Sequence, residues 1–184
     1  MDYRVIRSAR RTVTLQIKRG EVIVRVPHRM SERDIDRFVQ AHSEWIEKNL
    51  AEYAKRIKKF EDVTPLTEQE LQELKKRAKL IFEQRVAHYA PLLGVTYSKI
   101  TVRAQRTRWG SCSSNGNLSF NCLLLLAPDE VLDCIVVHEL CHRKEMNHSE
   151  RFYREVLRVF PEYDKWHTWL KQNGEGLIRR LPQK

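Results

Sequence analysis

Two short stretches near the N-terminus alternate between apolar and polar residues. Every second position is apolar in residues 13–17 and again in residues 22–26, which is the period of half-buried β-strands. The four residues between them, 18–21, include Gly20 and predict the turn of a β-hairpin. A similar alternation in residues 3–5 suggests a short preceding strand. The chain is therefore expected to begin with a small sheet.

A helical pattern follows the hairpin. Ser31 is a potential N-terminal cap, and the apolar residues from Ile35 to Leu50 recur with a helical period. The lysine-rich residues 51–66 are interpreted as a connection. Residues 1–60 are thus predicted to form an N-terminal β-β-α unit, and residues 61–184 to form a second domain.

The second domain mixes helical and strand patterns. Thr67 and Glu70 match a capping box, and the helical period after them runs to about Pro91. Residues 100–104 and 118–124 alternate, and Asn115-Gly116 between them is a typical hairpin turn. Three more helices are predicted: one that begins at Pro128, one that Ser149 caps and Pro161 stops, and a last amphipathic piece with Trp166, Trp169 and Leu170. The combination predicts an α+β fold with a small antiparallel sheet.

The predicted helix that begins at Pro128 contains the sequence His138-Glu139-Leu140-Cys141-His142, an H-E-x-x-H motif. Residues i and i+4 of a helix lie about 40° apart around the axis and about 6 Å apart along it, so both imidazoles can bind one metal ion. Glu139 is next to the first ligand and can take a proton from a metal-activated water. The motif predicts a zinc hydrolase with Glu139 as general base.

A third histidine, His148, follows six residues after His142. In an uninterrupted helix it would lie about 9 Å further along the axis and about 120° around it, too far to share the metal. The helix must therefore end first, and Asn147 is the predicted breaker because Asn tolerates the left-handed conformation. Three histidines and one water would form a catalytic site for a single Zn²⁺.

Charge and cysteine content indicate possible partners and the cellular location of the protein. The 184 residues carry a net charge of +10, and residues 1–60 hold fifteen basic against eight acidic residues. A basic face can contact nucleic acid, nucleotides or an acidic protein, and an ordinary solvated surface explains the charge equally well. The four cysteines form no C-x-x-C pair, which suits reduced thiols. Without a secretion signal or a membrane-length apolar run, we expect a cytoplasmic protein with no membrane partner.

The stretch from Arg103 to Cys112 combines arginines with an aromatic residue and a glycine. Arg106, Arg108 and Trp109 are candidates to bind anionic groups of a substrate or to stabilise an oxyanion. A basic strand edge that leads into the hairpin is the structural alternative.

Several motifs together resemble the YgjP-like metallopeptidase family, which is related to the SprT-like and WLM zinc proteases. The shared segments are Arg106–Cys112, Asn121 with its strand, Ala127-Pro128, Val136–His142, and Asn147–Ser149 with Phe152. The resemblance implies a compact zincin-like domain, a minimal metalloprotease fold whose edge strand receives an extended peptide. It also implies His138, His142 and His148 as ligands and Glu139 as base, and it adds Asn121 as a candidate for substrate binding. The spacing matches the metzincin motif as well, but Glu145 stands where that motif requires glycine.

Three functions follow as hypotheses. The first is a cytoplasmic zinc metallopeptidase that cleaves peptide bonds with a zinc-activated water and Glu139. The second is a zinc-dependent pyrophosphohydrolase of nucleoside triphosphates, because some members of the family resembled act on UTP and the arginine-rich stretch suits phosphate. The third is a basic, nucleic-acid-associated adaptor that retains a zinc fold.

Overall fold

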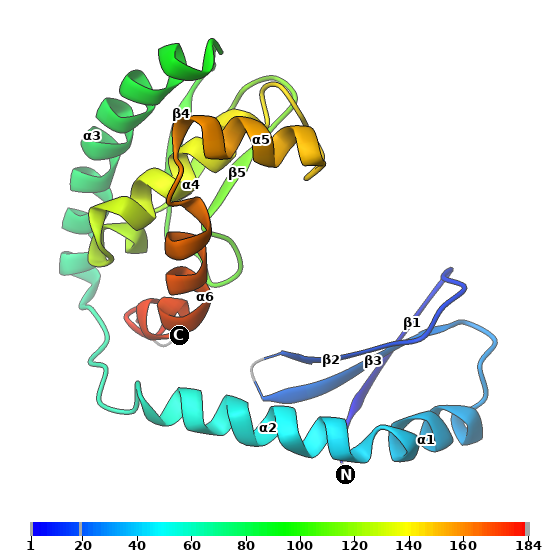
Figure 1. The fold of residues 1–184 in the computed structure, drawn as a ribbon. Helices are drawn as coiled ribbons and strands as arrows, with labels where there is room; N and C mark the ends of the chain where they lie inside the picture. Colours follow the sequence, from blue (N-terminus) through cyan, green and yellow to red (C-terminus); the bar gives the residue numbers. More distant parts are fainter. Residues whose placement is uncertain (1, 19, 183–184) are drawn as a thin grey trace. The chain divides into compact units, whose positions relative to one another are not determined.

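The structure, a computed structural model, describes residues 2–18 and 20–182. The chain forms two units that divide after Glu61 (Figure 1). Each unit combines one three-stranded sheet with helices, so the predicted α+β class is confirmed. All four cysteines are free thiols.

The first unit builds its sheet around β3. Its elements are β1 (Arg4–Ser8), β2 (Thr14–Lys18), β3 (Glu21–Pro27), α1 (Glu32–Ala41) and α2 (Ser43–Lys58). The strand order is β1-β3-β2, with β2 antiparallel and β1 parallel to β3. The valines of β3 face the apolar side of the helices, and the core of this unit comprises Val22, Val24, Val26, Ile35, Val39 and Ile46.

The helical part of this unit differs from the prediction in two ways. Ser31 caps α1 as expected, since its side chain accepts a hydrogen bond from the Asp34 backbone N–H. The predicted single helix to Leu50 is instead broken at His42, which caps the C-terminus of α1 with non-helical backbone angles. The first half of the connection predicted at residues 51–66 is helical, because α2 continues to Lys58. Basic side chains in the last turn of α2 suit the negative end of its dipole.

The second unit carries the histidine motif. Its elements are α3 (Glu68–Leu93), β4 (Ile100–Arg103), β5 (Gly110–Cys112), β6 (Leu118–Asn121), the 3-10 helix η1 (Cys122–Leu126), α4 (Asp129–Cys141), α5 (Glu150–Val159) and α6 (Tyr163–Arg179). The capping box of Thr67 and Glu70 is present as predicted. Gly94 ends α3 in the left-handed conformation, with φ of 67°.

The sheet of the second unit is mixed rather than purely antiparallel. Its order is β4-β6-β5, with β5 antiparallel to β6 and β4 parallel to β6. The strand predicted to reach Leu124 ends at Asn121, where the Asn121 side chain accepts a hydrogen bond from the Leu123 N–H and starts η1. This side-chain cap turns the chain out of the sheet.

Helix α4 lies at the centre of the second unit. It contacts α3, α5, α6, β5 and η1, and Figure 1 shows it running between α3 and the C-terminal helices. Nearly every side chain from Val131 to Cys141 is buried, as expected for a helix that is apolar on all sides. His138 and Glu139 are therefore held by a helix with little freedom to move. Within the described residues, no helix is long and apolar enough to cross a bilayer.

Candidate metal centre

Three histidine side chains converge at the C-terminal end of α4. The potential ligand nitrogens of His138, His142 and His148 all lie within 4.8 Å of one another. The Nε2 atoms of His138 and His148 face each other at 3.1 Å. In the part of the chain that the structure describes, no other histidine, cysteine or carboxylate joins this group. The local chemistry is that of an all-imidazole site.

The chain turns back to bring His148 to the other two histidines. The predicted breaker, Asn147, is wrong as the helix end, because α4 already ends at Cys141 with His142 as its cap. Arg143 donates to the carbonyls of Thr96 and Ser114 and so directs the chain away from the helix axis. Six residues after Arg143, Ser149 caps α5 through the Phe152 N–H, as predicted.

The ring orientation of His142 is fixed by the backbone of the turn. Its Nδ1 lies 3.1 Å from the Glu145 carbonyl oxygen. A carbonyl only accepts hydrogen bonds, so Nδ1 carries the proton and Nε2 presents a lone pair. Such an outer hydrogen bond is what metal-binding histidines usually make.

Phe152 lies beneath the three imidazoles. Its ring centroid is 4.9 Å from that of His138, 4.7 Å from that of His142 and 4.9 Å from that of His148. The Phe152 side chain is fully buried. One rigid ring therefore contacts all three histidines and joins α5 to the end of α4 at this point.

The geometry and electrostatics of the group fit a metal ion. Two nitrogen ligands of a tetrahedral zinc lie about 3.3 Å apart, close to the 3.1 Å between the Nε2 atoms of His138 and His148. Burial, and then the neighbouring histidines, lower the pKa of His138 to about 3. Burial also lowers the pKa of His142. Both rings are thus neutral at pH 7, the state in which imidazole binds a metal.

Glu139 is buried against β5. Only 6% of the residue is exposed, and this burial raises the pKa of its carboxyl to about 8. A Cβ atom added at Gly110 would lie 2.5 Å from Glu139 Oε1 and 2.6 Å from its Cγ. The carboxyl group therefore occupies the space that a side chain at Gly110 would fill.

The chain belongs to the YgjP-like metallopeptidase domain family. Residues 11–72 and 64–173 match that family, which confirms the resemblance seen in the sequence. A 54-residue segment is 39% identical to the UTP pyrophosphatase of Escherichia coli (strain K12), covering 27% of this chain and 32% of that protein.

Two solved structures are also similar to this YgjP-like chain. The metallopeptidase zymogen of Pyrococcus abyssi abylysin is 28% identical with a TM-score of 0.43, covering 50% of this chain and 96% of that chain. The metallopeptidase zymogen of Methanocaldococcus jannaschii jannalysin is 24% identical with a TM-score of 0.45, covering 50% of this chain and 95% of that chain.

Asn121, a predicted substrate-binding residue, is surrounded by backbone groups to which it hydrogen-bonds. It is fully buried, and its Nδ2 donates to the carbonyls of Gln105 and Arg108. Its Oδ1 accepts from the Leu123 N–H. Both ends of the amide are thus engaged by backbone groups, and Asn121 holds the loop between β4 and β5.

The other three substrate-binding candidates lie in this loop. Arg106 donates from Nη2 to the Pro182 carbonyl. The Trp109 ring packs against α6, where a Cβ on Gly174 would lie 2.8 Å from Trp109 Cζ2. Arg108 is exposed and directly precedes the Trp109-Gly110 pair, so it is the candidate closest in sequence to the Glu139 contact.

Three contributors to the site were not recognised from the sequence: the hydroxyl of Tyr163, the ring of Phe152, and Gly110, whose lack of a side chain leaves room for the Glu139 carboxyl group. Tyr163 places its hydroxyl 2.8 Å from His138 Nδ1. The only signal for Phe152 and Gly110 was their presence in the motifs of the family resemblance, which assigns no contact to either.

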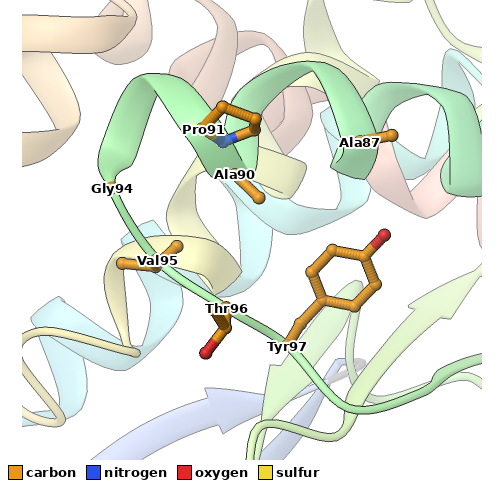
Figure 2. A pocket seen from close by; sticks show the side chains of 7 residues that line it. All are labelled: Ala87, Ala90, Pro91, Gly94, Val95, Thr96 and Tyr97. Carbon is orange, nitrogen blue, oxygen red and sulfur yellow. The ribbon is translucent and has the colours of Figure 1, made fainter.

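A pocket elsewhere in the second unit lacks side chains of the kind that bind zinc. It lies at the C-terminal end of α3, has a volume of about 470 Å³ and is lined by residues between Ala87 and Tyr97 (Figure 2). Its lining contains no histidine, cysteine or carboxylate. The histidine group at the end of α4 therefore remains the candidate site.

Proposed function

We propose that this YgjP-like protein is a zinc-dependent metallopeptidase with Glu139 as its general base. The observation that carries the proposal is the convergence of three imidazoles beside the buried carboxylate of the same helix. Membership of a metallopeptidase domain family supports it. The alternative of a closed structural site is disfavoured, since three histidines leave one position of a tetrahedral ion open.

Zinc suits this set of donors. His138, His142 and His148 would hold the ion through neutral ring nitrogens. When bound in such a site, zinc lowers the pKa of a coordinated water to about 7 and polarises a substrate carbonyl. The protein's contribution is to keep the rings neutral, oriented and close together before the ion arrives.

Glu139 moves the proton in the proposed reaction. Its carboxylate takes a proton from the attacking water as the water oxygen bonds to the carbonyl carbon. It then delivers that proton to the amine nitrogen as the C–N bond breaks. Burial raises the pKa of Glu139 to about 8, which makes it a stronger base than an exposed carboxylate, while a cation beside it favours the ionised form.

Metal loading should stabilise the fold. At a free zinc concentration of about 100 times Kd, binding is worth about 2.7 kcal/mol, so the wild-type melting temperature should rise by several degrees. His148→Ala should lose most of this rise, whereas His88→Ala should keep it because His88 is exposed and meets the Tyr89 ring edge to face. Scanning calorimetry with zinc and with a chelator measures the difference. An equal rise in His148→Ala would remove His148 from the metal site.

Nucleoside triphosphates are the second candidate substrates. A 54-residue segment matches a UTP pyrophosphatase, and the exposed Arg108 is available for a phosphate group. In this version the same water would attack phosphorus, and pyrophosphate would leave. The metal site itself does not distinguish the two reactions.

A parallel screen distinguishes the two substrate classes. Zinc-loaded protein is incubated with a fluorogenic peptide library and, separately, with UTP and the other nucleoside triphosphates, with Glu139→Gln as the blank. We expect peptide cleavage that the blank lacks, and no pyrophosphate above the blank. Pyrophosphate release without peptide cleavage would replace the peptidase by the pyrophosphohydrolase. Arg108→Gln would then be expected to raise the KM for UTP.

A further inference from the structure

Tyr163 connects the last helix of the second unit to the first histidine of the motif. Its hydroxyl oxygen lies 2.8 Å from His138 Nδ1, and the two rings are nearly parallel, at 11° with centroids 6.0 Å apart. Only 1% of Tyr163 is exposed. Burial raises the pKa of this phenol well above its usual range, so the hydroxyl keeps its proton at every physiological pH.

The position of the phenol is well defined by its surroundings. Tyr163 is the first residue of α6, and its N–H donates to the Phe160 carbonyl. The Cys134 thiol of α4 donates to the Tyr163 carbonyl at 3.7 Å. The imidazole of His167 stacks on the phenol ring with centroids 5.1 Å apart. The hydroxyl therefore meets His138 from a fixed direction.

The hydrogen bond between Tyr163 and His138 bears on which ring nitrogen of His138 carries the proton. Its Nε2 points at His148 Nε2, 3.1 Å away, where a metal would need a lone pair from each ring. His138 can offer that lone pair only if Nδ1 carries the proton. The Tyr163 oxygen is the group beside Nδ1 that can accept it, just as the Glu145 carbonyl accepts from His142.

We propose that Tyr163 is a positioning residue for metal binding: its hydroxyl accepts the Nδ1–H of His138 and so holds that ring in the tautomer and orientation that direct Nε2 to the ion. This inference rests on the metal centre of the proposed function, but not on which substrate is hydrolysed. A phenylalanine would fill the same buried volume, so the proposal concerns the hydroxyl alone.

The test compares Tyr163→Phe with Tyr153→Phe. Tyr153 is a matched control because its ring lies 6.3 Å from that of His148 and is partly exposed. Competition with a chromophoric chelator gives the zinc affinity. We expect Tyr163→Phe to bind zinc about 10- to 100-fold more weakly and Tyr153→Phe to stay within about twofold of wild type. Urea unfolding of the metal-free proteins measures separately any loss of stability.

A spectroscopic readout separates positioning from packing. In zinc-loaded wild-type protein labelled with ¹⁵N-histidine, long-range NMR correlations should show a proton on His138 Nδ1 that exchanges slowly with water. In Tyr163→Phe this signal should shift and exchange faster, while the Nδ1 proton of His142 serves as an unchanged reference.

Several outcomes would overturn the inference. One is wild-type affinity and an unchanged His138 signal in Tyr163→Phe, and another is a loss of metal-free stability with unaltered zinc affinity. If Tyr163→Phe does not fold, a wild-type spectrum in which Nδ1 of His138 lacks its proton decides against it. Failure of the wild-type protein to cleave peptides would contradict the proposed function and leave this inference standing, because neither readout requires hydrolysis.

Discussion

Replacing Glu139 with Gln is expected to abolish hydrolysis while the metal stays bound. An amide of the same shape cannot accept the proton of the attacking water, and the loss of a general base costs about 10²- to 10⁴-fold in kcat. None of the three histidines depends on the Glu139 carboxylate for a hydrogen bond that the structure shows; two use Tyr163 and the Glu145 carbonyl. Zinc content by elemental analysis and kcat on the best peptide of the screen measure the two effects.

Glu150→Gln provides the matched control for this change. Glu150 lies two residues after His148, in the first turn of α5, and its exposed side chain pairs only with Arg154 among the described contacts. Loss of one charge near the site should leave kcat within about twofold, because exposed ion pairs contribute little. Full activity in Glu139→Gln would contradict the proposed mechanism, as would an equal loss in both variants.

The local part of the site could be predicted from the sequence because its geometry is local. Two histidines four residues apart on a buried helix must lie on one face, and the need for a break before His148 follows from the same arithmetic. The caps at Ser31, Thr67 and Ser149 were likewise predicted, since each depends on a side chain and a backbone N–H three residues apart.

What the sequence did not predict depends on distant contacts. Helix α4 ends at Cys141 rather than near Asn147, and the Arg143 side chain just after it binds the carbonyls of two other loops. Strand β4 is parallel to β6, and β5 pairs with the other edge of β6; no alternation pattern reveals this arrangement. The backbone hydrogen bonds of Asn121 were not predicted either, since its partners lie 13 and 16 residues away.

The basic charge of the first unit suggests an anionic partner but does not define a binding site. Contact with an acidic protein or nucleic acid through this unit stays a prediction. Charge alone specifies an attraction to anions without specifying a site. By contrast, the histidine group has defined donors, distances and protonation states. The second unit therefore indicates a particular chemistry, whereas the charge of the first unit indicates no particular partner.

Introducing a methyl group at Gly110 is expected to disable the site without removing the metal. In Gly110→Ala the new Cβ would lie 2.5 Å from Glu139 Oε1 and 2.8 Å from its Cδ, distances that real side chains do not tolerate. Because β5 is hydrogen-bonded to β6 and α4 is fully packed, the carboxylate is the group that must move. A displacement of about 1 Å can cost about 10²-fold in rate, which kcat/KM on the best peptide would measure.

Gly94→Ala is the control that separates this steric effect from a general effect of losing a glycine. At Gly94 the added Cβ meets nothing within 4 Å, but φ is 67°, so the change strains the backbone by about 1 kcal/mol far from Glu139 in sequence. It should lower the free energy of unfolding and leave kcat/KM unchanged. Gly110→Ala should instead retain its zinc content and lose its activity. If Gly110→Ala keeps wild-type activity, the carboxylate of Glu139 does not need the position in which β5 holds it, and its assignment as the base loses its geometric support.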